Sequence, residues 1–106
     1  MKLIDIARVI RTKNSGPFII TIDIIFKDEQ MYYKLKKRNY FSSDWWASLY
    51  NIPPEDVLSV FYFDPAFAVK ANIKRYISSG DFGDSDVYGA QQHAPLLEVE
   101  IEDENG

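Results

Sequence analysis

The chain has 106 residues, of which 46% are hydrophobic and 15% aromatic, and a formal net charge of −4. This composition is too apolar for a disordered chain and fits one domain with a single core. The lack of cysteine excludes disulfides and zinc–thiolate sites. The lack of a run of about 18 apolar residues argues against a membrane span, and the lack of a charged-then-apolar leader argues against a signal peptide. We therefore expect a single cytoplasmic domain, residues 1–106, that is held together by packing alone.

The net charge hides an asymmetry between the two halves of the chain. Residues 1–53 carry nine Lys/Arg against five Asp/Glu, a balance of +4, whereas residues 54–106 carry three against eleven, a balance of −8. The basic excess comes mainly from one short run, Lys34, Lys36, Lys37 and Arg38. Nucleic-acid binding needs a larger basic surface with stacking aromatics beside it, so we interpret this run as a solvated helix face and expect no nucleic-acid partner.

The first elements are predicted from their hydrophobic spacing. Residues 3–11 fit either a helix with an apolar stripe or a strand with isoleucines on one face, and both alternatives stay open. Residues 12–17 have the composition of a turn. Residues 18–26 form the clearest strand, because Phe and Ile alternate along one face while the other face is partly apolar as well. This strand is therefore expected in the interior of a sheet, or covered by a partner.

Two short helices are predicted next. Asp28 is placed to cap a helix that ends near Arg38. Ser42 or Ser43 can cap a second helix, which the Pro53-Pro54 pair ends. Apolar and aromatic residues four apart give this second helix a broad apolar face.

The remaining pattern predicts three strands. Residues 57–63 and 67–73 are two strands joined at Asp64-Pro65, and residues 97–101 are a closing strand with Leu97, Val99 and Ile101 on one face. Residues 102–106 are expected to form a frayed tail. The order of the elements predicts an α+β fold, with a mixed or antiparallel sheet and two short helices on one face.

Polar groups are concentrated in residues 84–95, within a long segment that has no helical or strand periodicity. The chain's single histidine, His93, is the candidate catalytic residue. It could act as a general base, as a metal ligand or as a hydrogen-bonded loop residue, and the third role is the commonest for a lone histidine in a polar loop. The calcium-loop pattern of further acidic ligands is missing, so no metal site is predicted. The side chains that can bind a ligand there are Asp84, Asp86, Tyr88, Gln91 and Gln92.

A second candidate segment precedes the glycine–proline turn at residues 16–17. Its cations can form an anion site with the backbone amides of that turn, although solvated cations at a strand end are an equally good interpretation. The binding candidates are Arg8, Arg11, Lys13 and Asn14. We expect this segment to meet residues 86–93 and to hold a small anionic ligand between them, because opposite charges are stabilised by approach.

Three stretches of the chain resemble a known family: residues 2–18, the Asp64-Pro65-Ala66 turn and residues 86–96. The family consists of small proteins of about this length that are associated with AtuA-like proteins of acyclic terpene utilisation, either as a separate partner or as a C-terminal segment. The resemblance implies an AtuA-like large subunit as partner and a ferredoxin-like α+β fold. It implies no catalytic residue and no cofactor.

Two functions follow as hypotheses. The first is an accessory domain that works with an AtuA-like large subunit in acyl-thioester or hydroxy-acid catabolism, and the absence of standard catalytic motifs favours it. The alternative is a small independent lyase or isomerase that uses His93 as base, with Arg11 or Lys13 holding a substrate carboxylate. The apolar content further predicts docking or a homo-oligomer, through a sheet or helix surface.

Overall fold

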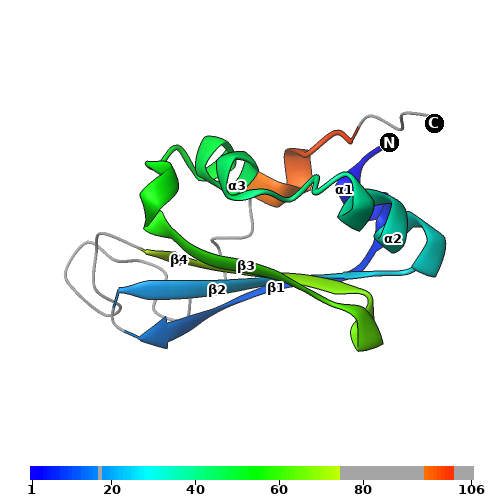
Figure 1. Cartoon of the computed structure of the whole chain (residues 1–106), viewed down its shortest axis with the longest axis horizontal. Coiled ribbons are helices and arrows are strands. Elements are labelled where there is room, and N and C mark those ends of the chain that lie inside the picture. The colour runs from blue at the N-terminus through cyan, green and yellow to red at the C-terminus, as the bar shows by residue number, and fades with distance from the viewer. Residues whose placement is uncertain (17, 75–94, 102–106) are drawn as a thin grey trace.

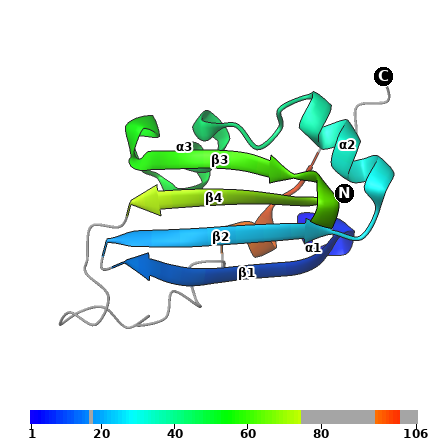
Figure 2. The same ribbon diagram turned by 60° about the horizontal axis from the view of Figure 1, so that its bottom comes forward.

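The computed structural model describes residues 1–16, 18–74 and 95–101. A four-stranded antiparallel sheet of order β1-β2-β4-β3 carries a layer of short helices on one face (Figure 1, Figure 2). The elements are α1 Leu3–Ile6, β1 Ala7–Gly16, β2 Ile19–Phe26, α2 Glu29–Lys37, α3 Ser43–Tyr50, β3 Val57–Phe63 and β4 Ala68–Lys74, with 3-10 turns η1 Pro54–Asp56 and η2 Asp64–Ala66. The predicted α+β class is confirmed.

The succession of elements is more specific than the class. From β1 to β4 the chain runs strand, strand, helix, helix, strand, strand. Ferredoxin-like domains follow the order β-α-β-β-α-β, and the order from β1 to β4 in this chain differs from it. No helix in the described parts of the chain is long and apolar enough to cross a membrane.

The start of the chain resolves the ambiguity of residues 3–11, because a single helical turn, α1, leads directly into β1. The predicted turn at residues 12–17 is wrong over residues 12–16, and residue 17 lies outside the described residues. Thr12, Lys13 and Asn14 pair with Ile22, Thr21 and Ile20 of β2, and β1 continues to Gly16. Pairing with a strongly apolar neighbouring strand overrides the turn propensity of these small polar residues.

Strand β2 lies between β1 and β4, which confirms an interior strand. Ile20, Ile22 and Ile24 are buried against the helices. Phe18, predicted to share their face, lies outside β2 and is 50% exposed. The strand's other face includes Thr21 and is the side away from the helices.

Both helices begin where predicted. The Asp28 side chain accepts a hydrogen bond from the backbone N–H of Gln30, and Ser42 accepts one from that of Trp45. Helix α3 ends at Tyr50, before the proline pair, because Asn51 takes a left-handed conformation with φ of 55° that closes the last turn. The prediction that Pro53-Pro54 ends the helix is therefore wrong, because the helix has already ended at Tyr50.

The hairpin of β3 and β4 follows the prediction closely. Strand β3 has the predicted bounds, whereas β4 begins one residue late, at Ala68. Phe67 belongs to the turn: its φ is 51°, and its backbone N–H donates to the carbonyl oxygen of Asp64 at 3.1 Å. The Asp64-Pro65-Ala66 stretch thus forms a compact reversal that sets the pairing of Phe63 with Ala68.

The predicted closing strand is wrong. Residues 95–98 form a 3-10 turn, and the only ladder contact of this described segment is an isolated bridge between Lys2 and Glu100. Leu96 and Val99 are buried, whereas Leu97 is 43% exposed. A spacing of three places both buried side chains on one side of a helical turn, and an alternating pattern cannot distinguish this from a strand. The predicted tail, residues 102–106, lies outside the described residues.

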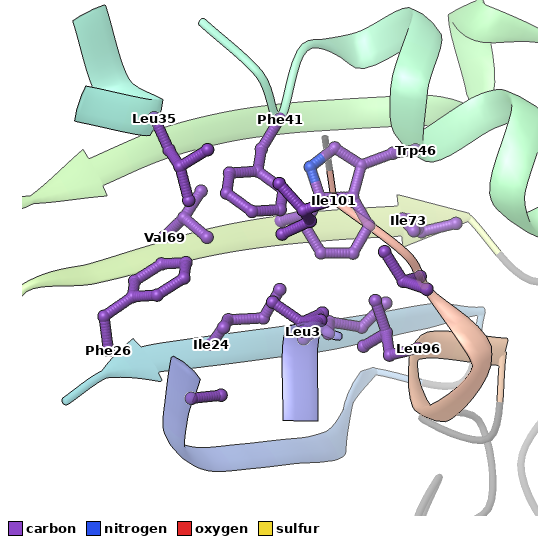
Figure 3. Packing of buried hydrophobic residues seen from close by; sticks show 14 of the residues in the cluster. Leu3, Ile24, Phe26, Leu35, Phe41, Trp46, Val69, Ile73, Leu96 and Ile101 are labelled. Atoms are coloured by element: carbon purple, nitrogen blue, oxygen red, sulfur yellow. The ribbon is translucent and has the colours of Figure 1, made fainter. Parts of the chain in front are cut away.

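The buried core fills the space between the sheet and the helices (Figure 3). Its largest fully buried side chains are Trp46, Tyr32, Phe41, Leu3, Ile22, Ile24, Leu35, Leu96, Ile101 and Val69. The two ends of the described chain are joined here: the Leu3 N–H donates to the carbonyl of Val99 at 3.1 Å, and the Ile101 N–H donates to that of Met1 at 2.7 Å. The C-terminal segment therefore completes the core.

A polar cluster attaches the β3–β4 turn to α2. Asp64 accepts a hydrogen bond from the Tyr32 hydroxyl at 2.5 Å and from the Lys36 ammonium at 2.8 Å and 2.9 Å. The bond from Lys36, and after it the bond from Tyr32, lowers the pKa of the Asp64 carboxyl below its ordinary value. Ionised Asp64 therefore holds the turn on the helix more strongly than the protonated acid does.

Replacing Asp64 by asparagine should lower the melting temperature at neutral pH and change its dependence on pH. A lowered folded-state pKa contributes stability above the unfolded-state value, about 3.9, and this contribution is lost as pH falls through the folded-state pKa. The difference in melting temperature between wild type and Asp64→Asn should therefore shrink in acid. Thermal melts between neutral pH and acid measure it, with Glu98→Gln at an exposed position as control. A difference that stays constant in acid would contradict this role.

Candidate functional site

One face of the sheet is left uncovered by the described elements. Helices α1, α2 and α3 and the C-terminal segment lie on the other face (Figure 1, Figure 2). We call the uncovered side the open face; its residues are Val9, Arg11, Lys13, Ser15, Ile19, Thr21, Asp23, Ile25, Ser59, Phe61, Phe63, Ala68, Lys70, Asn72 and Lys74. An antiparallel sheet with one solvated face normally carries polar residues there. This one carries aromatic and charged residues side by side.

The register of the strands aligns the open face into rows. The central row contains one residue from each strand: Arg11, Asp23, Lys70 and Phe61. On one side of it lies an apolar row, Val9, Ile25, Ala68 and Phe63. On the other side lies a polar row, Lys13, Thr21, Asn72 and Ser59. Cross-strand neighbours in such rows are within contact distance of each other.

The central row contains a buried carboxylate between two cations. The Asp23 side chain is only 7% exposed, and its Oδ2 accepts a hydrogen bond from Arg11 Nε at 3.0 Å. Lys70 Nζ lies 3.7 Å from Oδ1, close enough for an ion pair but beyond hydrogen-bond distance. Oδ1 has no hydrogen-bond partner among the described residues. A buried charge is tolerated where opposite charges surround it, and here two of them do.

A hollow of about 280 Å³ lies beside this carboxylate. It is lined by Arg11, Asp23, Ile25, Phe61, Phe63, Ala66, Ala68 and Lys70. Ala68 contributes a small side chain to this lining, and the register places it between Ile25 and Phe63. Lys70 Nζ also lies 5.9 Å from the centroid of the Phe61 ring, within range of a cation–π contact.

Hydrogen bonds join three residues of the polar row, together with Ser15, into a network. The Thr21 hydroxyl donates to Asn72 Oδ1 at 2.6 Å, Asn72 Nδ2 donates to Ser59 Oγ at 2.8 Å, and Ser15 Oγ bonds to Thr21 Oγ1. Thr21 is buried at 5% exposure, so the network satisfies a polar group that would otherwise be costly. These residues stabilise the sheet next to the hollow rather than offer groups to a ligand.

The structure separates the basic residues that the sequence grouped together. Arg11 and Lys13 lie on the open face, but only Arg11 lines the hollow. Arg8 is exposed at the irregularity of β1 between Ala7 and Val9, and Asn14 is opposite Ile20, in register with the helix-covered face. Because β1 is an edge strand, charges and a bulge there also block pairing with another strand.

The remaining predicted site residues lie outside the described residues. They are the candidate base His93 and the binding candidates Asp84, Asp86, Tyr88, Gln91 and Gln92. The predicted meeting of this segment with the basic residues of β1 lies outside the described residues as well, and so does the pocket expected between them.

Of the residues that line the hollow, sequence reasoning selected only Arg11; those it missed include Asp23, Phe61, Phe63 and Lys70. One signal was available, since Asp23 is the only charged residue in the strand Ile19–Phe26. A charge within a buried strand requires a partner. Finding that partner needs the register across three strands, which single-strand periodicity does not supply.

The hollow is suited to binding. Its groups are two cations, one carboxylate, two aromatic rings and small apolar side chains, and it contains no nucleophile paired with a base. Within the described ranges, no three His, Cys, Asp or Glu side chains gather closely enough to hold a metal ion. What the arrangement offers is charge recognition beside an apolar surface.

Comparison with known proteins gives one match. The model of a family described as a domain of unknown function, DUF4387, matches residues 3–100. Comparison with curated proteins and with solved structures finds no match.

Proposed function

We propose that this chain, which belongs to the DUF4387 family of domains of unknown function, is an accessory domain that docks on a larger protein through the open face of its sheet. The observation that carries the proposal is the exposure of Phe61 and Phe63 on that face, at 44% and 50%. They are two residues apart on edge strand β3 and point to the same side. Exposed apolar groups that lie together mark interaction sites.

The composition of the open face resembles the centre of a protein interface. Aromatic residues and arginine are enriched in such centres, and each central aromatic can contribute much of the binding energy. Phe61, Phe63 and Arg11 are all present here, beside the apolar surface of Ile25 and Ala68. The helices on the other side of the sheet leave this face accessible as far as the described residues extend.

The charge of the open face indicates the kind of partner. Arg11, Lys13, Lys70 and Lys74 occupy register positions on this face against a single carboxylate, Asp23. A complementary surface is therefore acidic around an apolar centre. The AtuA-like large subunit implied by the sequence resemblance is the partner we propose, with a role in acyl-thioester or hydroxy-acid catabolism. The lyase or isomerase alternative depends on His93, which lies outside the described residues.

A binding experiment with purified proteins tests this proposal. The AtuA-like large subunit encoded by the same genome should bind the wild-type chain in isothermal titration calorimetry, and Phe63→Ser should weaken the affinity at least about tenfold, as expected for a buried aromatic contact. Leu97→Ser is the matched control, because Leu97 is similarly exposed, at 43%, in the C-terminal segment.

Two outcomes would contradict the proposal: no binding by the large subunit, or equal binding by wild type and Phe63→Ser. Sedimentation of the chain alone tests the expected homo-oligomer. A dimer that Phe63→Ser dissociates and Leu97→Ser does not would make a second copy the occupant of the open face, in place of the large subunit.

A further inference from the structure

We propose that the hollow on the open face binds a small organic monoanion, a carboxylate attached to an aromatic or short apolar body. This goes beyond the docking proposal, because it assigns a ligand to the chain itself and needs no partner. A ligand bound there would lie at the interface once a partner docks, and interfaces between domains are common places for small-molecule sites.

The charges around the hollow favour a single negative charge on the ligand. Arg11 and Lys70 bring two positive charges to one carboxylate, Asp23, so the central row has an excess of one positive charge. The hydrogen bond to Asp23 comes from Nε of Arg11, and the two terminal nitrogens of the guanidinium take no part in it. The side chains of Arg11 and Lys70 are 64% and 37% exposed, so both can reach an incoming carboxylate.

Asp23 acts as a positioning residue in this arrangement. Its carboxylate is 7% exposed and lies between the two cations, which it holds at the edge of the hollow. Cations held in advance lose less conformational entropy when the ligand binds. The charge of Asp23 also disfavours dianions, since it cancels one of the two positive charges.

The walls of the hollow favour an apolar body on the ligand. Phe61 and Phe63 are about half exposed beside Ala68 and Ile25, so a ring placed there removes apolar area from water on both sides. A volume of about 280 Å³ lies between a cavity that holds one benzene, roughly 150 Å³, and pockets for drug-sized ligands, which begin at about 300 Å³. One ring with a carboxylate suits this size.

A titration of the full chain followed by NMR tests the site, with phenylacetate as the probe. Its amide signals should shift saturably in β3 and β4, around Phe61, Phe63 and Lys70. The three comparison probes are 2-phenylethanol, which has the ring without the charge, acetate, which has the charge without the body, and 2-phenylethylammonium, which reverses the charge. Each should bind at least about tenfold more weakly than phenylacetate. For 2-phenylethanol and 2-phenylethylammonium this factor corresponds to one lost charge-assisted contact, and for acetate to the lost burial of the ring.

Variants separate this site from a general effect of positive charge. Lys70→Met and Arg11→Met should each weaken phenylacetate binding about tenfold and leave 2-phenylethanol binding unchanged. Lys37→Met makes the same change of charge on α2, at an exposed position outside the hollow, and should leave phenylacetate binding unchanged. The amide spectrum of each variant also shows whether it is folded.

Three results would overturn the proposal: no saturable shift with phenylacetate, equal affinity for phenylacetate and 2-phenylethanol, or an equal loss of binding in Lys37→Met and Lys70→Met. Each of them would leave Arg11, Asp23 and Lys70 as a purely structural ion triad. None bears on docking, because the titration contains no partner protein.

Discussion

Replacing Trp46 by alanine should lower the free energy of unfolding by about 4 kcal/mol. Trp46 is fully buried, and its ring lies 4.9 Å from that of Trp45 and 6.3 Å from those of Phe41 and Tyr50, measured between centroids. Figure 3 places it within the buried cluster between the helices and the sheet. Truncation removes the contacts of the largest buried side chain and leaves a cavity that its rigid aromatic neighbours cannot fill. Domains have a total stability of roughly 5–15 kcal/mol, so a large part would be lost.

Urea denaturation followed by far-UV circular dichroism measures the effect, and Trp46→Phe is the matched control. The indole Nε1 of Trp46 is buried without a hydrogen-bond partner among the described residues. Phenylalanine keeps most of the buried ring and removes this unsatisfied donor, which itself costs about 1–3 kcal/mol. Its loss of stability should therefore be a small fraction of that of the alanine variant. Equal losses in the two variants would contradict this expectation, because a packed phenyl ring would then recover none of the stability that alanine loses.

Removing both cations of the central row should cost about 3 kcal/mol, whereas removing the carboxylate they surround should cost little. In the double variant Arg11→Met/Lys70→Met, the buried Asp23 loses the two ion pairs that compensate its desolvation. In Asp23→Val no charge is left buried, because Arg11 and Lys70 are partly exposed and can be solvated. Valine also suits a central strand.

The free energies of unfolding of four proteins measure this asymmetry: wild type, the double variant, Asp23→Val and the triple variant that combines all three changes. The triple variant should regain most of the stability that the double variant loses, since the uncompensated charge is gone. If Asp23→Val is as unstable as the double variant, the carboxylate itself stabilises the sheet. The ion pairs of the central row would then contribute net stability to the fold.

The local signals in the sequence were sufficient for much of the fold. Asp28 and Ser42 cap helices as expected, since each bonds to a backbone N–H within three residues, and such contacts depend only on the nearby sequence. The bounds of β3 follow from a run of apolar residues between a proline pair and an Asp-Pro turn. The α+β class follows from the order of these elements.

The errors occurred where contacts between distant residues decide the structure. Residues 12–16 have the composition of a turn, but they pair with β2 because its apolar residues provide a neighbouring strand. Leu96 lies in the 3-10 turn of residues 95–98 and Val99 directly follows it, and both close the core over Leu3 near the other end of the described chain. The alternating hydrophobic residues 97, 99 and 101 were compatible with a strand. Packing against the core decides that Leu96 is buried and Leu97 is exposed.

The candidate site was the least predictable part. The sequence directed attention to the cations of β1 and to residues 84–95, which lie outside the described residues apart from Pro95. The hollow combines Arg11 with Asp23 and Lys70 from the two neighbouring strands. In the sequence, α2, α3 and β3 separate β2 from β4, so the alignment of Asp23 with Lys70 depends on the complete sheet. Once the Asp64-Pro65-Ala66 turn sets the hairpin register, the position of Lys70 beside Phe61 follows.

The contacts between the two ends of the described chain have a consequence for biosynthesis. Leu3 leaves the ribosome before the residues that close the core over it, Leu96, Val99 and Ile101. At about 5–20 residues per second, the sheet and helices emerge seconds before the last part of the core. During that interval the growing polypeptide exposes an incomplete apolar core, which is the kind of surface through which partly folded chains aggregate.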